Sequence, residues 1–131
     1  MMKSLLTIFT LVFTMMFSST SFAEWTRVTE GLDGTIFYVD FERIRKVDGY
    51  VYFWDLSNRL KPSEGGNLSV AIYKQGDCKL FRHQRLSYVF YKGPMGGGAS
   101  DVQEPEKTSQ GWNYPLPNSV DESILQSVCS W

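Results

Sequence analysis

The sequence predicts a small α+β domain that consists of one antiparallel sheet and one C-terminal helix. Short runs of β-branched and aromatic residues recur between turn signals along most of the chain. Only the C-terminal end changes to the spacing of apolar residues that is typical of an amphipathic helix. Repeated strands followed by one late helix are typical of the α+β class, and we expect about five to six strands in a single domain.

Residues 1–23 have the pattern of a secretory signal peptide. Lys3 supplies a positive charge, Leu5 to Phe17 form an apolar run, and Ser21 and Ala23 are the small residues that a signal peptidase reads. The run is shorter than the roughly 20 apolar residues that span a bilayer. We therefore expect cleavage after Ala23 and an exported protein, either periplasmic or secreted.

The mature domain, residues 24–131, has a nearly balanced charge. Removal of Lys3 leaves 12 Lys and Arg against 14 Asp and Glu, a net charge of about −2. Residues 18–24 contain no cysteine, the residue that is acylated in a bacterial lipoprotein, and no second long apolar run follows. We therefore expect a soluble mature domain without a stable membrane anchor.

The first half of the mature domain carries four strand signals separated by turns. Asp40 to Arg43 favours a turn or a single helical turn, and Asp48-Gly49 suits a two-residue hairpin loop because both residues tolerate a positive φ. The four strands are expected at Trp25–Thr29, Thr35–Val39, Ile44–Val47 and Tyr50–Leu56.

The aromatic residues of the fourth strand predict the buried face of the sheet. Tyr50, Tyr52 and Trp54 share one side of this strand, and we assign Tyr88 and Phe90 to the same core face. A domain this small needs its large side chains for burial, which favours a role in the core. The alternative is an exposed stacking platform of the kind that binds single-stranded nucleic acid or sugars.

The second half of the sheet is predicted between two loops. Two strand regions are expected, with a turn at Gly76-Asp77 between them and a bend near His83 in the second. A glycine-rich loop of unusual length and a last extended segment follow. In chain order the segments are Arg59–Asn67 (loop), Leu68–Lys74 (strand), Cys78–Tyr91 (one or two strands), Lys92–Gly111 (loop) and Trp112–Leu116 (extended).

The C-terminal helix has both a start signal and an apolar side. Ser119 followed three residues later by Glu122 forms a capping box, in which each side chain accepts a hydrogen bond from a backbone N–H of the first turn. Ile124, Leu125 and Val128 then fall on one side together with Cys129. We expect this side to lie on the sheet.

The two cysteines, Cys78 and Cys129, predict one disulfide. An even cysteine count in a small exported domain favours a structural bond, whereas no CxxC motif supports a redox pair and a single histidine gives little support to a metal site. Closing a loop of this length stabilises the fold by about 4 kcal/mol in the chain-entropy model. The bond is expected to hold the helix on the sheet.

No group of residues has the pattern of a catalytic or cofactor site. Gly96 to Gly98 lack the Lys-Ser/Thr pair of a phosphate-binding loop. The acidic pairs 40/42 and 121/122 fit a turn and the first turn of a helix. His83 has no nucleophile motif near it and is expected to be an exposed strand residue. We therefore predict that the protein is not an enzyme and binds no cofactor or metal.

The central part of the chain is its one basic region. Residues 43–92 contain ten Lys and Arg against four Asp and Glu, an excess of about +6. Arg82, Arg85 and Lys92 follow one predicted strand and are the candidate site for a polyanionic or protein partner. The alternative is an ordinary solvated face whose charges block edge pairing. Nucleic acid is not expected for an exported domain of net negative charge.

Several short motifs occur in a recognisable order along the mature domain. They are Tyr38-Val39-Asp40, Ile44 to Gly49, Trp54-Asp55-Leu56, Asp77-Cys78-Lys79, Tyr91 to Gly96 and Pro117-Asn118-Ser119 followed by Val128-Cys129. With their two cysteines, these motifs resemble the bacterial surface-adhesin protein E family. The resemblance implies that the chain is a small exported domain of a Gram-negative bacterium. It also implies an antiparallel sheet, a C-terminal helix and a disulfide between Cys78 and Cys129.

The resemblance also implies a class of function. The founding adhesin is an outer-membrane lipoprotein that binds host matrix and serum proteins and can dimerise, so a homodimer is among the expectations. We expect a non-enzymatic, adhesin-like binding module for host or envelope macromolecules. The alternative is a soluble periplasmic accessory or stress-related protein that acts on an envelope component.

Overall fold

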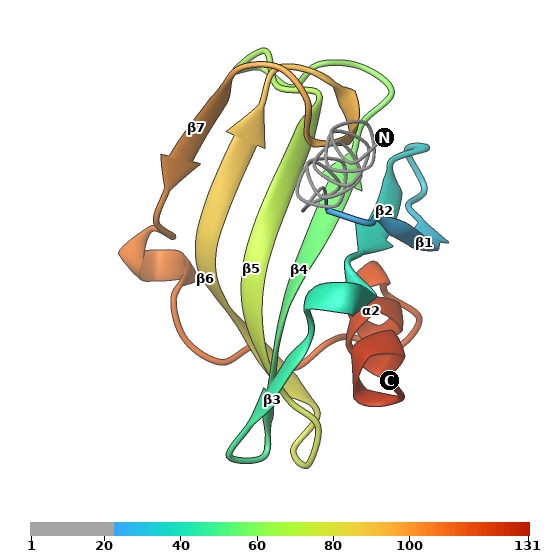
Figure 1. The fold of residues 1–131 in the computed structure, drawn as a ribbon, viewed down its shortest axis with the longest axis vertical. Helices are drawn as coiled ribbons and strands as arrows, with labels where there is room; N and C mark the ends of the chain where they lie inside the picture. Colours follow the sequence, from blue (N-terminus) through green and yellow to red (C-terminus); the bar gives the residue numbers. More distant parts are fainter. Residues whose placement is uncertain (1–22) are drawn as a thin grey trace, which may run out of the picture.

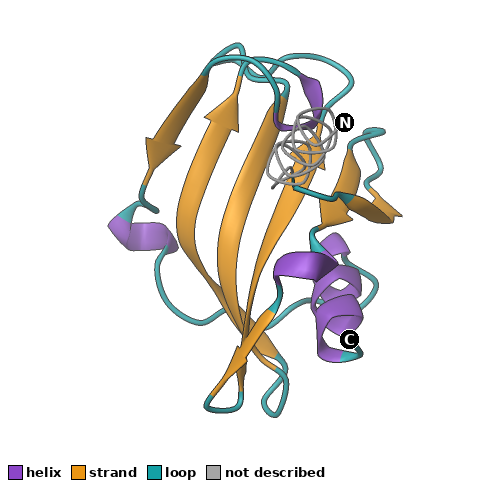
Figure 2. Ribbon diagram, viewed as in Figure 1, coloured by secondary structure: helices purple, strands orange, loops and turns teal. Residues whose placement is uncertain are grey.

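A computed structural model describes residues 23–131 of the chain, so the predicted signal segment lies outside the described residues except for Ala23. The described residues form one antiparallel seven-stranded sheet with one α-helix, in agreement with the predicted α+β fold (Figures 1 and 2). The strands are β1 (Thr26–Glu30), β2 (Ile36–Val39), β3 (Arg45–Val47), β4 (Tyr50–Asn58), β5 (Ser69–Asp77), β6 (Arg82–Tyr91) and β7 (Ser100–Gln103). The helices are η1 (Phe41–Arg43), η2 (Pro94–Gly96), η3 (Lys107–Ser109) and α2 (Val120–Cys129).

The sheet is built around the long strands β4, β5 and β6. Its order is β1-β2-β4-β5-β6-β7, and β3 also pairs with β4. Strands β2 and β3 share one edge of β4, because η1 interrupts what would otherwise be one long strand. The expected single helical turn and the expected hairpin are both present, with Asp48 at φ 52° and Gly49 at φ 84°.

The core lies between the sheet and α2. The apolar side of the helix, Ile124, Leu125 and Val128, is almost completely buried, as predicted. It packs on Val51 and Phe53 of β4, together with Val39 of β2. Gly76 of β5 permits this close approach, because a Cβ there would come 2.8 Å from Val51 and 3.0 Å from Leu125.

The predicted core face is therefore wrong for β4. Tyr50, Tyr52 and Trp54 alternate with the buried residues and point away from α2, where they remain half-buried. Tyr88 lies on the other side of the sheet, the side of α2. It pairs with Ile72 of β5, and Ile72 pairs with Asp55, which faces α2. The alternation of residues showed that the strand has two faces but not which of them the single helix covers.

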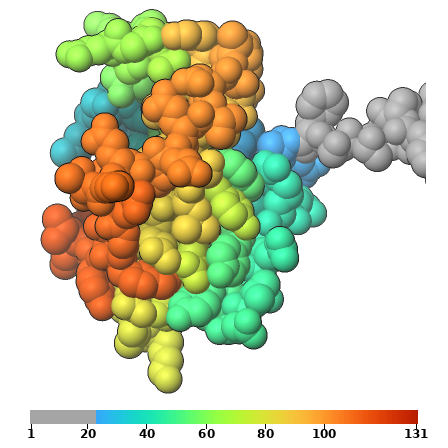
Figure 3. Space-filling model, turned by 90° about the vertical axis from the view of Figure 1, so that its left-hand side faces the viewer, coloured from blue at the N-terminus to red at the C-terminus, as the bar shows by residue number. Residues whose placement is uncertain are grey.

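The long loop predicted at residues 92–111 is only partly a loop. Its middle forms β7, which pairs with the edge of β6 and adds a strand to the predicted number. Its beginning forms η2, where the Met95 N–H donates to Asn58 Oδ1 over 2.8 Å. In Figure 3, the orange residues of this segment lie against the body of the domain. The segment therefore covers the β6 edge and the upper end of the sheet.

The beginning of α2 has the expected cap with one difference. Ser119 Oγ accepts a hydrogen bond from the Glu122 N–H over 3.1 Å, as the capping box predicts. Glu122 Oε1 accepts from the Asn118 N–H over 3.2 Å, one residue earlier than the box requires. At the other end of the helix Cys129 forms the predicted disulfide with Cys78, with their Cα atoms 5.7 Å apart. Within residues 23–131, no helix combines the length and apolar character needed to cross a membrane.

Candidate binding surface

The side of the sheet away from α2 carries a group of aromatic side chains. Figure 1 looks onto this side of the sheet. Strands β4 and β5 contribute four of the rings because alternate residues point to this side. The fifth comes from the segment after η3, which is bound beside β6 by a pair of backbone hydrogen bonds between His83 and Asn113. We call Tyr50, Tyr52, Trp54, Tyr73 and Trp112 the aromatic face.

The rings of the aromatic face lie in contact with one another. The Tyr50 and Trp112 ring centroids are 5.8 Å apart, and those of Tyr52 and Tyr73 are 6.3 Å apart. Trp54 lies 5.0 Å from Tyr73 in a tilted arrangement. Such contacts stabilise aromatic pairs by about 0.5–1.5 kcal/mol beyond the burial of area, so the rings hold each other in position.

Guanidinium groups lie over two of these rings. Arg82 lies 4.2 Å from the centroid of Trp112, and Arg43 lies 5.9 Å from that of Trp54, both within cation–π range. Arg45 is exposed on β3 and pairs in register with Tyr52, which places it on the same side of the sheet. The aromatic face is therefore accompanied by three arginines.

The carboxylates that pair with two of these arginines are buried. Arg43 Nε donates to Asp40 Oδ2, and Arg82 Nε donates to Asp77 Oδ2 over 3.0 Å. Asp40 is 1% exposed and Asp77 is 6% exposed, whereas the side chain of Arg43 is 50% exposed. These acids position the arginines from below, so the charge that reaches the solvent here is mainly cationic.

The pKa values of the Arg82–Asp77 pair shift in the direction that keeps both groups charged. The backbone N–H of Leu80 is the main cause of the lowered pKa of Asp77, and the hydrogen bond from Arg82 adds to it. The hydrogen bond with Asp77 in turn raises the pKa of Arg82. The position of Arg82 above Trp112 is thus fixed by a stable ion pair.

Polar side chains complete this surface between β4 and β6. Gln84 Nε2 donates to Gln75 Oε1 over 2.6 Å, and Gln75 Nε2 donates to the Tyr52 hydroxyl over 3.0 Å. The chain of hydrogen bonds orients two amides and one phenol across three neighbouring strands. It gives the aromatic face donors and acceptors suited to hydroxyl groups.

The structure does not bring the three basic residues predicted as a polyanion site together. Arg82 lies over Trp112 of the aromatic face, but Arg85 points to the α2 side, 3.8 Å from Asp121. Lys92 lies beyond β6, where its amine donates to the Gly65 carbonyl over 2.7 Å. The prediction of one contiguous patch was wrong because residues 82 and 85 point to opposite faces of the sheet. This follows from ordinary alternation along β6, because the two residues are three positions apart and the bulge in the β5–β6 register comes only after Arg85.

A second polar group lies on the α2 side, between β4, β5, β6 and the first turn of α2. Lys74 Nζ lies 2.5 Å from Asp55 Oδ2 and 3.9 Å from Asp121 Oδ1. His83 Nε2 lies 3.8 Å from Asp121 Oδ2, and Arg85 is the fifth member. We call these five residues the buried charge cluster. Asp55, Lys74 and His83 are each at most 3% exposed.

The prediction of an exposed His83 was wrong. His83 is 2% exposed, because backbone partners flank it on both sides and the beginning of α2 lies against it. Burial, assisted by the positive charge of Lys74, lowers its pKa to about 4, and Asp121 only partly opposes this. Burial also raises the pKa of Asp55, against the opposing effect of Lys74.

The His83→Gln variant should show a weaker acid dependence of stability than the wild type. The folded pKa of His83 is about 4 against an ordinary value of 6.5, so the unfolded state binds the proton more readily between these values. Stability is therefore lost as the pH falls from about 6.5 to about 4, by about 3 kcal/mol from this residue. Asp55 acts in the opposite direction, because its raised pKa stabilises the fold as the pH approaches 4 from above. Urea unfolding at pH 7 and pH 4.5 measures the free energy of unfolding of each protein. An equal loss of stability in the wild type and the variant between these pH values would contradict the lowered pKa of His83.

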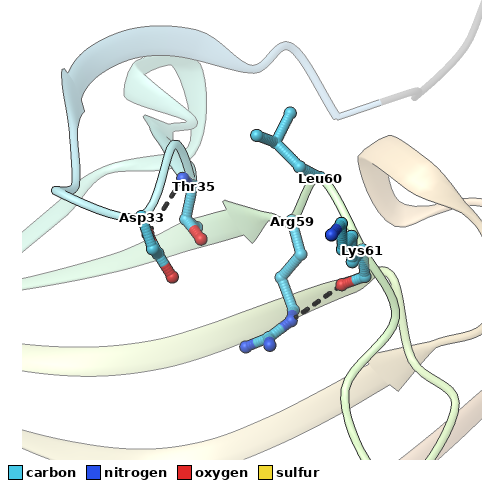
Figure 4. Close-up of a pocket in the computed structure, with 5 residues that line it drawn as sticks. All are labelled: Asp33, Thr35, Arg59, Leu60 and Lys61. Atoms are coloured by element: carbon cyan, nitrogen blue, oxygen red, sulfur yellow. Dashed lines mark hydrogen bonds between the residues drawn. The ribbon is translucent and has the colours of Figure 1, made fainter.

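One pocket of the described residues lies between the β1–β2 loop and the loop after β4. Figure 4 shows a pocket of about 260 Å³ where Asp33 accepts a hydrogen bond from the Thr35 N–H and Arg59 donates to the Lys61 carbonyl. These polar groups are used by their own loops, and the Thr35 N–H is the main cause of the lowered pKa of Asp33. No group of three or more potential metal ligands occurs among residues 23–131.

Another pocket adjoins the aromatic face. It has a volume of about 260 Å³ and is lined by Trp54 of the aromatic face and by Arg43, Trp25 and Tyr91. Ala23, the last residue before the predicted cleavage point, also lines it. The pocket is smaller than the roughly 300–1,000 Å³ of typical small-molecule sites. It therefore extends the aromatic face and does not form an enclosed binding cavity of its own.

Comparisons with known proteins identify relatives of this fold. Structures of Haemophilus influenzae protein E are similar to this chain. For crystal form II the TM-score is 0.63 at 19% sequence identity, and the match covers 86% of this chain and 91% of protein E. The selenomethionine form of protein E has a TM-score of 0.61, with 90% of its chain covered, and protein E from a non-typeable strain has a TM-score of 0.58, with 79% of its chain covered. Both matches have 19% sequence identity and cover 86% of this chain. At this identity the likeness shows the fold alone. A comparison with curated protein sequences found no match.

The family is shown by a sequence match that does not depend on these structures. The family model described as surface-adhesin protein E matches residues 25–130, nearly the whole of the expected mature domain. This range contains every motif on which the sequence resemblance rests. The chain therefore belongs to the surface-adhesin protein E family.

Proposed function

We propose that this protein is an exported, non-enzymatic, adhesin-like module that binds a host or envelope macromolecule through its aromatic face. The observation that carries the proposal is the group of five half-buried rings on the sheet side away from α2, with arginines held over two of them. Tyrosine, tryptophan and arginine are the residues most enriched at the centres of protein interfaces. Membership of a surface-adhesin family supports the same class of function.

The buried charge cluster does not compete with this proposal as a catalytic site. Asp55, Lys74 and His83 are nearly inaccessible, and the pockets described above do not include them. A substrate would need to displace the beginning of α2 to reach them. We assign the cluster a structural role in positioning α2 on the sheet.

The Trp112→Ser variant should bind its macromolecular ligand at least about tenfold more weakly than the wild type. Removal of this ring takes away the partner of Tyr50 and the support of Arg82, and aromatic hot-spot residues of interfaces contribute about 2 kcal/mol or more. The measurement is binding of the mature domain to arrays of matrix proteins, serum proteins and envelope polymers.

The matched control is Leu60→Ser, which removes a 72%-exposed apolar side chain from the loop between β4 and β5. It should leave ligand binding unchanged. Equal binding by the wild type and the Trp112→Ser variant would overturn the assignment of the aromatic face. Binding to no array member would overturn the proposal of an adhesin-like module.

The location of the protein in the cell distinguishes this proposal from the periplasmic alternative. The absence of a cysteine in residues 18–24 is the observation that favours a soluble periplasmic protein. Protease treatment of intact cells should degrade a protein displayed on the surface, whereas osmotic shock should release a periplasmic one. Release without surface cleavage would replace the adhesin-like role by an accessory role in the envelope.

A further inference from the structure

We propose that the ligand of the aromatic face is an acidic polysaccharide, a chain of sugars that carries carboxylate or sulfate groups. This inference rests on the proposed function and names the ligand class of the same surface. It follows from the shape of the surface, from the positive sign of its exposed charge, and from the contacts that its aromatic rings make with one another and with Arg82.

The shape of the surface suits an extended chain. Its rings follow one another across β4 and β5, from Trp112 and Tyr50 through Tyr52 and Tyr73 to Trp54. Beyond Trp54 the surface continues into the pocket lined by Trp25 and Tyr91. This pocket of about 260 Å³ is below the usual size of a closed small-molecule site. A polymer can lie along the rings and place one unit in the pocket.

The charge of the surface selects an anion. Arg43, Arg45 and Arg82 lie on or beside the aromatic face, while the acids Asp40 and Asp77 are buried beneath two of them. Guanidinium groups bind carboxylate and sulfate-like oxyanions through paired N–H donors. Arg43 and Arg82 use Nε for their buried acids, and each guanidinium carries further N–H donors on its two terminal nitrogens. A neutral polymer would leave these cations without a counter-charge.

The remaining polar groups suit sugar hydroxyls. Tyr52, Gln75 and Gln84 form an oriented chain of one phenol and two amides between the ring groups. Phenols and amides both donate and accept, as a hydroxyl requires of its partners. The apolar sides of sugar rings can then pack on the aromatic surface between them. The combination provides for the acidic, hydroxyl and apolar parts of an acidic sugar.

Single-stranded nucleic acid is the main competing polymer, and the rings are arranged unfavourably for it. Bases bind such proteins by stacking on free aromatic ring faces. Here Arg82 lies over Trp112, which also stacks with Tyr50, and the remaining rings contact one another. Arg82 therefore covers a Trp112 face that a base would stack on, while the arginines and the hydrogen-bonded amides remain partners for the acidic and hydroxyl groups of a sugar chain, so the observations favour the polysaccharide.

The test compares polymers that differ in one property at a time on the immobilised mature domain. Heparin carries sulfate and carboxylate groups, alginate carries carboxylates only, dextran is neutral and poly(dT) is a single-stranded nucleic acid. We expect heparin or alginate to bind, dextran not to bind, and binding to weaken steeply between low and physiological salt because the arginines are exposed.

Charge reversal at two exposed positions then locates the site. Arg45→Glu should weaken binding of the acidic polymer at least about fivefold. No ion-pair partner of Arg45 occurs among residues 23–131, so the variant leaves no buried acid uncompensated. Lys92→Glu makes the same charge change beyond the end of β6 and should leave binding unchanged.

Four results would overturn the inference. They are dextran binding as tight as that of the acidic polymers, tighter binding of poly(dT), equal weakening by Arg45→Glu and Lys92→Glu, and no binding of either acidic polymer. In the last case, binding of a matrix or serum protein that is lost in Trp112→Ser would still support the proposed function. Failure of the ligand class and failure of the surface are therefore distinguishable.

Discussion

Replacement of Lys74 by methionine should destabilise the fold by about 3–5 kcal/mol at neutral pH. Lys74 and Asp55 form a contact of 2.5 Å between β5 and β4, and their side chains are 4% and 2% exposed. Removal of one partner of a buried pair leaves the other charge without compensation, which costs more than the intact pair contributes. Methionine retains the length of the side chain, so loss of charge, and not loss of volume, is the expected cause.

The acid dependence of this variant gives an independent check. Burial already raises the pKa of Asp55, and removal of Lys74 removes the strongest opposing effect. The Asp55 carboxyl should therefore become neutral at a higher pH in the Lys74→Met variant, and its deficit should shrink as the pH falls. Urea unfolding at pH 7 and pH 5 measures both values. A deficit below about 1 kcal/mol at pH 7 would contradict the account of the pair.

The double variant Asp55→Leu/Lys74→Met is the matched control. It removes both charges, and replacement of a buried ion pair by apolar side chains is often neutral or stabilising. We expect it to recover most of the stability that Lys74→Met loses. A double variant as unstable as the single one would mean that the polar group is needed for packing, through Asp121 and His83, and not only for charge balance.

Much of the fold could be predicted from local patterns. The β-branched and aromatic runs, the Asp48-Gly49 hairpin and the capping box at Ser119 each act within a few residues of sequence. The strand β7 could not be predicted in this way. All four of its residues are exposed and show no alternation, so the strand exists because the free edge of β6 pairs with it.

The candidate surface could be predicted only in part, because it depends on which side of the sheet the helix covers. The size of Tyr50, Tyr52 and Trp54 favoured burial, yet the packing surface uses the smaller Val51 and the glycine opposite it. The prediction of a turn at Gly76-Asp77 was wrong, because both residues belong to β5. A glycine within a strand often marks a close approach of another element, so Gly76 was a signal for the helix side that we misread as a turn. The separation of Arg82 from Arg85 did have a signal in the sequence, because residues three positions apart on one strand point to opposite faces. The bulge in the β5–β6 register lies after Arg85 and does not separate the two residues.

Loss of the Cys78–Cys129 bond should lower the free energy of unfolding by about 2–5 kcal/mol. The bond joins the segment after β5 to the last residue of α2 across 51 positions. In the chain-entropy model a loop of this length contributes about 4 kcal/mol, because the bond restricts the unfolded chain. For a domain of this size the loss corresponds to a Tm lower by roughly 10–20 °C.

The native arrangement should nevertheless survive without the bond. Ile124, Leu125 and Val128 keep the helix on the sheet, and Lys46 donates to the Trp131 carbonyl while Phe41 packs against the Trp131 ring. We therefore expect the Cys78→Ser/Cys129→Ser variant to fold with the circular dichroism spectrum of the wild type and to melt at a lower temperature. Wild-type protein treated with a reducing agent should melt with this variant, since both lack only the cross-link. If the oxidised wild type and the double variant have the same Tm, the bond does not stabilise the domain, and the noncovalent contacts of α2 and Trp131 hold the helix on the sheet.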